Sequence, residues 1–128
     1  MMPKSDIYEY AVLRLVPRVE REEFINIGAL LLCRRQKFGE VMYHLDHERC
    51  LALFPGLDIP FIENQLKLFT KICRGDKDGG LIASQELHER FRWLTANRST
   101  MIQCSPVHIG LTTDAKATLQ DIFEKTVL

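Results

Sequence analysis

Two clusters of polar side chains in this sequence could do chemistry. The members of the first cluster are Arg14, Arg18, Arg21, Glu23 and Asn26. The members of the second cluster are Arg98, Ser99, Thr100, Gln103, Ser105 and His108. Arginine forks beside hydroxyl groups suit a phosphate or a carboxylate. A histidine in a turn bounded by proline and glycine could act as a general acid or base near neutral pH. The sequence therefore indicates where a ligand could bind, but not which reaction, if any, takes place.

Each of these groups also has a structural alternative. The arginines and the glutamate of the first cluster could form a salt-bridged loop, and Asn26 could hydrogen-bond within a sheet. In the second cluster, residues 98–100 could tie a loop to a strand, and His108 could be a structural histidine. Both interpretations stay open from the sequence alone.

No established catalytic or metal-binding motif is present. The sequence contains no nucleophile elbow, phosphate loop, dinucleotide fingerprint or His-Glu-x-x-His. His44 and His47, on either side of Asp46, resemble half a metal site but are more typical of a strand end followed by a helix cap. The cysteines are Cys33, Cys50, Cys73 and Cys104. No two of them have Cys-x-x-Cys spacing, and their apolar contexts predict buried free thiols. We therefore expect no metal and no cofactor.

Composition is that of an ordinary globular protein. A chain of 128 residues predicts a single domain over residues 1–128. Its 17 basic and 17 acidic residues balance, so no net charge favours nucleic acid or an anionic membrane. The N-terminus has no apolar core like that of a signal peptide, and no apolar run reaches the ~20 residues that cross a bilayer. We expect a cytoplasmic protein with reduced thiols.

The element that must position both clusters is the apolar run of residues 24–33. Because it is apolar on both alternating faces, it predicts an interior strand covered from both sides. Strict alternation puts Ile25, Ile27, Ala29, Leu31 and Cys33 on one face. Asn26 and Gly28 then share the other face with Phe24, Leu30 and Leu32. A covered Asn26 needs hydrogen-bond partners, and Gly28 lets another backbone approach closely.

The remaining pattern predicts an α+β fold. Residues 8–16 and 38–45 are strand-like and complete an N-terminal three-strand antiparallel meander. One later strand is expected over residues 99–104. Helices are expected to start at the caps Asp46, Asp58, Ser84 and Asp114. The predicted architecture is an antiparallel sheet of about four strands packed with about four helices.

These elements predict a joined site. We expect residues 18–26 and 98–108 to lie side by side at one end of the sheet. The reason is Asn26: the polar groups that match its spacing lie around Gln103, and an unsatisfied buried amide costs ~1–3 kcal/mol. The alternatives are a hydrogen bond from Asn26 to the 18–23 loop or to an ordered water.

The same residues carry a family resemblance. The first half consists of Tyr10, Arg14, Val16-Pro17 and Arg21-Glu22-Glu23-Phe24-Ile25-Asn26-Ile27-Gly28. The second half consists of Glu89-Arg90-Phe91-Arg92-Trp93-Leu94, Arg98-Ser99-Thr100, Gln103 and Ser105-Pro106-Val107-His108-Ile109-Gly110-Leu111. Together these motifs resemble the bacterial family catalogued as domain of unknown function 3037, over nearly the whole chain. The family has no established activity. Its members tend to be small bacterial proteins, and genes for kinase-like proteins of the toxin–antitoxin type lie beside some of them.

Two functional hypotheses follow. The first is a non-catalytic module that binds another protein, either the kinase-like protein that the resemblance implies or a second copy of itself. The second is an anion-binding protein, or an enzyme acting on a phosphorylated metabolite or a nucleic-acid end. In the second hypothesis Arg18, Arg21 and Arg98 clamp the phosphate and His108 is the general acid or base.

Overall fold

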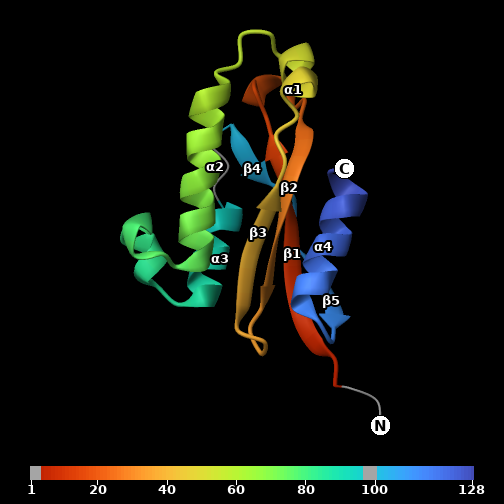
Figure 1. Cartoon of the computed structure of the whole chain (residues 1–128), viewed down its shortest axis with the longest axis vertical. Coiled ribbons are helices and arrows are strands. Elements are labelled where there is room, and N and C mark those ends of the chain that lie inside the picture. Colours follow the sequence, from red (N-terminus) through yellow and green to blue (C-terminus); the bar gives the residue numbers. More distant parts are fainter. Residues whose placement is uncertain (1–3, 97–100) are drawn as a thin grey trace.

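The computed structural model describes residues 4–96 and 101–128. Over these residues the chain forms an antiparallel sheet with helices on both faces (Figure 1). The strands are β1 (Asp6–Leu15), β2 (Ile25–Cys33), β3 (Phe38–Tyr43), β4 (Ile102–Cys104) and β5 (His108–Thr112). The helices are α1 (His47–Leu53), α2 (Ile59–Arg74), α3 (Leu87–Ala96) and α4 (Ala115–Thr126). This is the α+β fold that the sequence predicts, with one strand more than expected.

Strand β1 is the axis of the sheet. The consecutive strands β1, β2 and β3 form the predicted meander, so β2 lies in the interior of the sheet. Along its other side, β1 pairs with β4 through residues 13–15 and with β5 through residues 6–10. The two later strands therefore share one edge of the sheet and lie end to end along it.

The two faces of the sheet are covered by different helices. Helices α1, α2 and α3 lie on one face, and α4 lies on the other (Figure 1). The larger core lies on the α1–α3 face and includes Leu13, Leu30, Ile62, Leu66 and Leu94. On the α4 face, Ala29, Leu31 and Cys33 of β2 pack against Ala115 and Leu119. The absence of a polar face on β2 thus follows from a helix layer on each side.

Side-chain caps set the helix boundaries as predicted. The carboxylates of Asp46, Asp58 and Asp114 each accept a hydrogen bond from a backbone N–H in the first turn of α1, α2 and α4. Gly75 ends α2 in the left-handed conformation, with φ of 73°. The predicted cap at Ser84 is wrong, because Ser84 lies in a short 3-10 turn and its hydroxyl donates to the Leu81 carbonyl instead.

A β-bulge changes which side chains share a face. Leu13 pairs with Gly28 and Arg14 pairs with Asn26, so Ile27 is an extra residue in β2. Beyond this bulge, Ile27 packs into the α1–α3 core and Asn26 lies on the α4 face. The predicted strict alternation is therefore wrong at this point. The role of Gly28 is confirmed, since a Cβ there would lie 2.6 Å from the Met42 carbonyl oxygen.

The fifth strand is the element that sequence reasoning missed. His108 lies in β5 and not in a turn bounded by proline and glycine. Gly110 fits a strand because the Tyr8 ring covers it: a Cβ at Gly110 would lie 2.6 Å from the Tyr8 hydroxyl oxygen. Glycine in a strand here marks a close approach by a side chain.

The predicted state of the cysteines is confirmed. All four are buried free thiols. Within residues 4–96 and 101–128, no group of His, Cys, Asp and Glu could hold a metal ion. None of the helices in this part of the chain is long and apolar enough to cross a membrane.

Candidate functional site

Asn26, Arg14 and Gln103 form one polar row across three strands. Arg14 pairs with Asn26 on one side and with Gln103 on the other. Directly opposed residues project from the same face, which is the α4 face here. Asn26 and Gln103 are two strand spacings apart, or about 10 Å. The two predicted segments therefore flank the same end of β1 but are separated by it.

The amide of Asn26 holds α4. Its nitrogen donates to the Thr126 carbonyl at 3.2 Å, in the last turn of α4. Arg14 lies 4.3 Å from the centre of the Phe24 ring. Among the described residues, the Asn26 Oδ1 and Arg14 Nε atoms are buried without a hydrogen-bond partner. This row therefore anchors a helix, and two of its polar atoms are unsatisfied.

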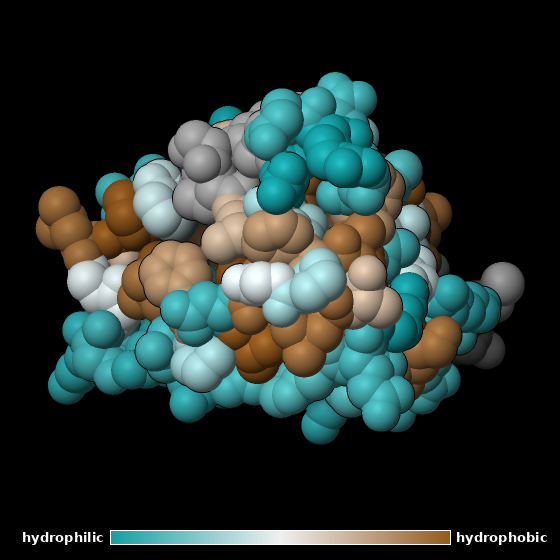
Figure 2. Space-filling model, turned by 90° about the horizontal axis from the view of Figure 1, so that it is seen from above, coloured by the Kyte–Doolittle hydropathy of each residue, from teal (hydrophilic) through white to brown (hydrophobic). Residues whose placement is uncertain are grey.

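Arg18 and Arg21 line a separate cleft of about 280 Å³ at the end of the molecule. Its lining residues are Pro17, Arg18, Arg21, Glu23, Leu53, Phe54 and Pro55. Figure 2 shows this end, with apolar side chains gathered across the middle between hydrophilic ones. Arg21 forms an exposed ion pair with Glu23 at 2.6 Å, which is the structural alternative for these two residues. Arg18 lies 5.2 Å from the centre of the Phe54 ring and has no ion pair among the residues described here.

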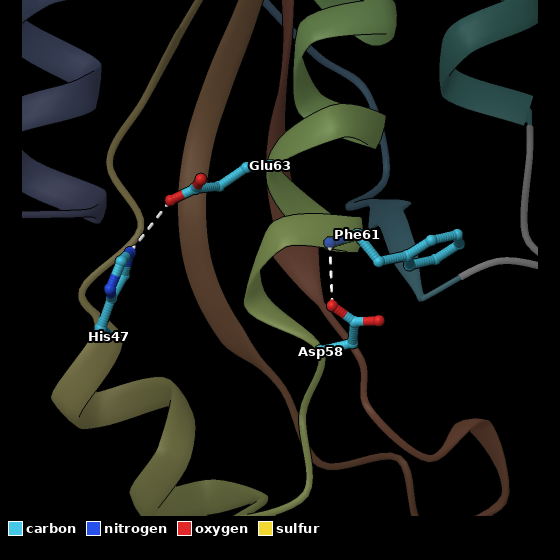
Figure 3. Close-up of polar contacts among 4 residues, drawn as sticks. All are labelled: His47, Asp58, Phe61 and Glu63. Carbon is cyan, nitrogen blue, oxygen red and sulfur yellow. Dashed lines mark hydrogen bonds and ion pairs between the residues drawn. The ribbon is translucent and has the colours of Figure 1, made fainter.

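The α1–α2 hairpin positions the Phe54 side of this cleft. The Asp58 carboxylate accepts from Phe61 N at 3.1 Å, and the His47 Nε2 atom lies 3.0 Å from the Glu63 carboxylate (Figure 3). These contacts fix the start of α2 and tie the two helices together. His47 is therefore paired with a carboxylate of α2 and is not half of a metal site with His44.

Ser105 has a structural role at the junction of β4 and β5. It is buried, and its hydroxyl accepts from Val12 N at 2.8 Å and donates to the Pro106 carbonyl at 2.9 Å. Its backbone N–H donates to the Val12 carbonyl at 2.8 Å. Ser105 thus continues the hydrogen-bonding ladder where β4 ends, because a hydroxyl replaces a backbone acceptor.

His108 lies away from the arginines. It is exposed, pairs with Tyr10 and stacks on that ring with centroids 5.1 Å apart. Tyr10 is four residues from Arg14 along β1, or about 13 Å. The geometry therefore does not join His108 to the Arg18 cleft. Arg98, Ser99 and Thr100 lie outside the residues that the structure describes.

The structure adds an apolar surface that the sequence did not single out. The side chains of Ile7, Ile109 and Leu111 are 64%, 72% and 68% exposed. We call these three residues the β1–β5 patch. Ile7 pairs directly with Leu111. All three side chains project from the α1–α3 face of the sheet, in a region that the helices do not cover. The alternation of apolar and other residues over positions 108–112 was the signal for this strand, but it spans only five residues.

A hollow lies beside the β1–β5 patch. It has a volume of about 470 Å³ and is lined by Ser5, Asp6, Ile7, Glu9, Leu32, Arg34 and Arg35. Ile7, Glu9 and Leu32 project from the same face of the sheet, since Glu9 pairs with Leu32. This corner of the sheet is therefore uncovered over parts of β1 and β5, whereas Leu32 of β2 is buried.

The outer edge of β5 also has unpaired backbone groups. Val12 exchanges hydrogen bonds with Ser105, and Val16 N donates to the Met101 carbonyl at 2.6 Å. Even-numbered residues of β1 thus point their peptide groups toward β4 and β5. By the alternation of an antiparallel ladder, the peptide groups of Ile109 and Leu111 point away from β1. None of the described strands pairs with this edge.

The fold and these surfaces define a small α+β protein whose sheet is exposed along β5. A family model described as "Protein of unknown function (DUF3037)" matches residues 10–127. The chain belongs to this family, which confirms the resemblance seen in its motifs. Neither a search of curated proteins nor a search of solved structures found a match.

Proposed function

We propose that this protein is a non-catalytic interaction module that binds an extended segment of a partner protein along β5. The observation that supports this proposal is the combination of an unpaired edge with the exposed β1–β5 patch. A partner strand added to such an edge gains backbone hydrogen bonds, and its side chains gain apolar contacts. The hollow lined by Glu9 and Arg34 offers space for a further partner side chain.

The character of β5 supports this role. Proteins commonly protect an edge strand with charged residues, proline, a bulge or a covering element. The strand His108–Thr112 contains no Asp, Glu, Lys, Arg or Pro. Single exposed apolar residues are ordinary, whereas contiguous ones mark an interaction surface. Fully burying one such aliphatic side chain is worth roughly 1.5–3 kcal/mol, so covering the patch is a substantial driving force.

Site-specific photocrosslinking tests this proposal. The photoreactive residue benzoylphenylalanine replaces Ile109 in the full chain. In the control, the same residue replaces Phe61, which is 48% exposed and lies on α2. We expect one discrete adduct from position 109 in the native cells and none from position 61. A second substitution, Ile7→Lys, should abolish the adduct. Equal labelling from both positions, or no adduct from position 109, would contradict the proposal. An adduct with the mass of a kinase-like protein would identify the partner that the resemblance implies.

Anion binding at the Arg18 cleft is the second candidate function. It is favoured by a guanidinium without an ion pair among the described residues, stacked on Phe54. A charge-assisted contact is worth roughly 1.5–3 kcal/mol, so phosphate, nucleotides or sugar phosphates should raise the thermal midpoint. Arg18→Ala should remove that shift, whereas Arg92→Ala, at an exposed position of α3, should not. The Glu23 carboxylate opposes an anion here, which is why this function ranks second.

A cytoplasmic location belongs to the same proposal. It is supported by four thiols that are buried and unbonded, as is usual in a reducing compartment. Fractionation of native cells with an antibody against the chain checks it, and recovery outside the cytoplasm would contradict it.

A further inference from the structure

We infer that the strand added to β5 is β5 of a second copy, with a two-fold axis passing through Gly110. This inference rests on the proposed function and names the partner. The two copies would then share one continuous antiparallel sheet. The argument comes from the register of the backbone groups, the positions of the aliphatic side chains and the distribution of charge.

The free backbone groups fix one register. Hydrogen bonds across the new edge must use Ile109 and Leu111, because their peptide groups point outward. With Gly110 of the two copies opposed, Ile109 of each copy faces Leu111 of the other. Each of these pairs is a hydrogen-bonded pair that exchanges both N–H···O bonds. The whole length of β5 is then used.

Neighbouring registers are worse. A shift that opposes Ile109 to its own copy pairs Leu111 with Val107, which lies before the start of β5. A shift in the other direction opposes Leu111 to its own copy and pairs Ile109 with Thr113. Thr113 lies beyond β5 and immediately before Asp114, the cap of α4.

The side chains are self-complementary in this register. Opposed residues of an antiparallel pair project from the same face, so the β1–β5 patches of the two copies become continuous. Along one row, Ile7 and Leu111 of one copy meet Ile109 of the other. The exposed aliphatic side chains of each copy therefore lie beside those of its partner, which is the condition for an isologous interface.

Charge does not oppose this pairing. The strand itself has no acidic or basic residue other than His108, and the nearest carboxylate on the patch face is Glu9, opposite Ile109. The two Glu9 residues would be three strand spacings apart across the sheet and two residues apart along it, or about 16 Å. This distance exceeds the screening length of about 8 Å at physiological ionic strength. The interface contains only one five-residue strand from each copy, so the dimer should be weak and its population should depend on concentration.

Sedimentation equilibrium of the full chain tests the inference. The mass should rise from 14.8 kDa toward twice that value as the concentration increases. Leu111→Lys should keep the protein monomeric. The matched control is Leu81→Lys, because Leu81 is 82% exposed but lies outside the sheet; this variant should associate like the wild type. Both leucines are largely exposed, so each variant should keep its fold, as circular dichroism would verify.

Disulfide trapping tests the register. Ile109→Cys and Leu111→Cys are prepared separately, then mixed and oxidised. Only the mixture should give a covalent dimer in high yield, because the inferred axis opposes position 109 to position 111. Covalent dimers from Ile109→Cys alone would overturn this register.

The inference and the proposed function can fail separately. A chain that stays monomeric, while the photocrosslink at position 109 captures a protein of another mass, overturns the second-copy inference alone. A monomer without any adduct overturns both. A dimer that forms equally well with Leu111→Lys also overturns the inference.

Discussion

The two edges of the sheet, β3 and β5, are covered to different extents. At the β3 edge, α2 and α4 cover the two faces, and Glu40 pairs with Arg74 of α2 at 2.8 Å. Phe38 and Met42 pack into the α4-side core. None of the described strands pairs with the outer side of β3 or of β5, but at the β5 edge Ile109 projects into solvent. The comparison shows that the fold can protect an edge, and that β5 lacks this protection.

The position of the helices explains the difference. Gly39 in β3 lets α3 approach the sheet closely, since a Cβ there would overlap the Leu87 side chain. The helical layer on this face therefore sits over β3, β2 and the second half of β1. The first half of β1 and all of β5 lie beyond it, where Ile7 and Leu111 are exposed. The edge at β3 is therefore covered because the helices pack over it, and the edge at β5 is exposed because they do not.

The largest contrast should appear between two leucines of the same sheet. Leu13 is completely buried, whereas Leu111 is 68% exposed. Leu13→Ala should lower the free energy of unfolding by about 2–5 kcal/mol, because it leaves a cavity. Leu111→Ala should change it by no more than about 0.5 kcal/mol in dilute solution. Urea unfolding of both variants measures the difference, and similar losses would show that the β1–β5 patch is part of the core.

Much of the covered part of the fold could be predicted from the sequence. The run over residues 24–33 predicted an interior strand because both of its alternating faces are apolar apart from Asn26. The caps Asp46, Asp58 and Asp114 predicted helix starts because each carboxylate satisfies a free N–H. These signals are local, so the sequence contains them directly.

The open part and the polar row could not be predicted in the same way. The bulge at Ile27 depends on the pairing of two strands, and it moves Asn26 to the other face. The partner of Asn26 is a carbonyl of Thr126, 100 residues away, which no local pattern encodes. The segment around His108 was interpreted as a turn because Pro106 and Gly110 flank it, whereas the Tyr8 ring of another strand covers that glycine. Tertiary contacts decided each of these cases.

A second contrast concerns pH. Burial, together with the nearby Glu40 carboxylate, raises the pKa of the Cys73 thiol to about 12. The unfolded chain loses this proton near pH ~8.5, so folding favours the protonated thiol. The resulting stability is present below that value and is lost as pH rises toward the folded pKa. Between about pH 9 and about pH 11, the free energy of unfolding should fall by up to about 1.4 kcal/mol per pH unit from this group.

The control for this prediction is Cys73→Ala. The substitution leaves a cavity and lowers stability at every pH, so the comparison uses slopes and not absolute values. The variant should lack the part of the alkaline slope that belongs to Cys73. Equal slopes for the variant and the wild type would show that the thiol titrates normally in the folded chain.

A smaller effect is expected at the turn between β2 and β3, where Gln36 links the start of β1 to the start of α4. The Gln36 side chain accepts from Ala115 N at 2.9 Å and donates to Asp6 at 3.0 Å. Gln36→Ala removes the acceptor for the Ala115 N–H and the hydrogen bond to Asp6. It should therefore lower the free energy of unfolding by about 1–2 kcal/mol. Gln120→Ala is the control, because Gln120 makes only an exposed contact of 3.4 Å. Thermal unfolding of both variants measures the difference, and equal midpoints would assign Gln36 no role at this corner.

The smallest effect is expected at the protected edge itself. The ion pair between Glu40 and Arg74 is partly exposed, and its hydrogen bond raises the pKa of the Arg74 guanidinium. Exposed pairs contribute about 0–1 kcal/mol, so Glu40→Gln should lower stability by no more than this. The loss should shrink at high salt, because the screening length falls to about 3 Å at ~1 M. The helices would still cover β3 in this variant, so sedimentation should detect no new association. If Glu40→Gln did associate, charge and not coverage would be what protects the β3 edge, and the contrast with β5 would need that explanation.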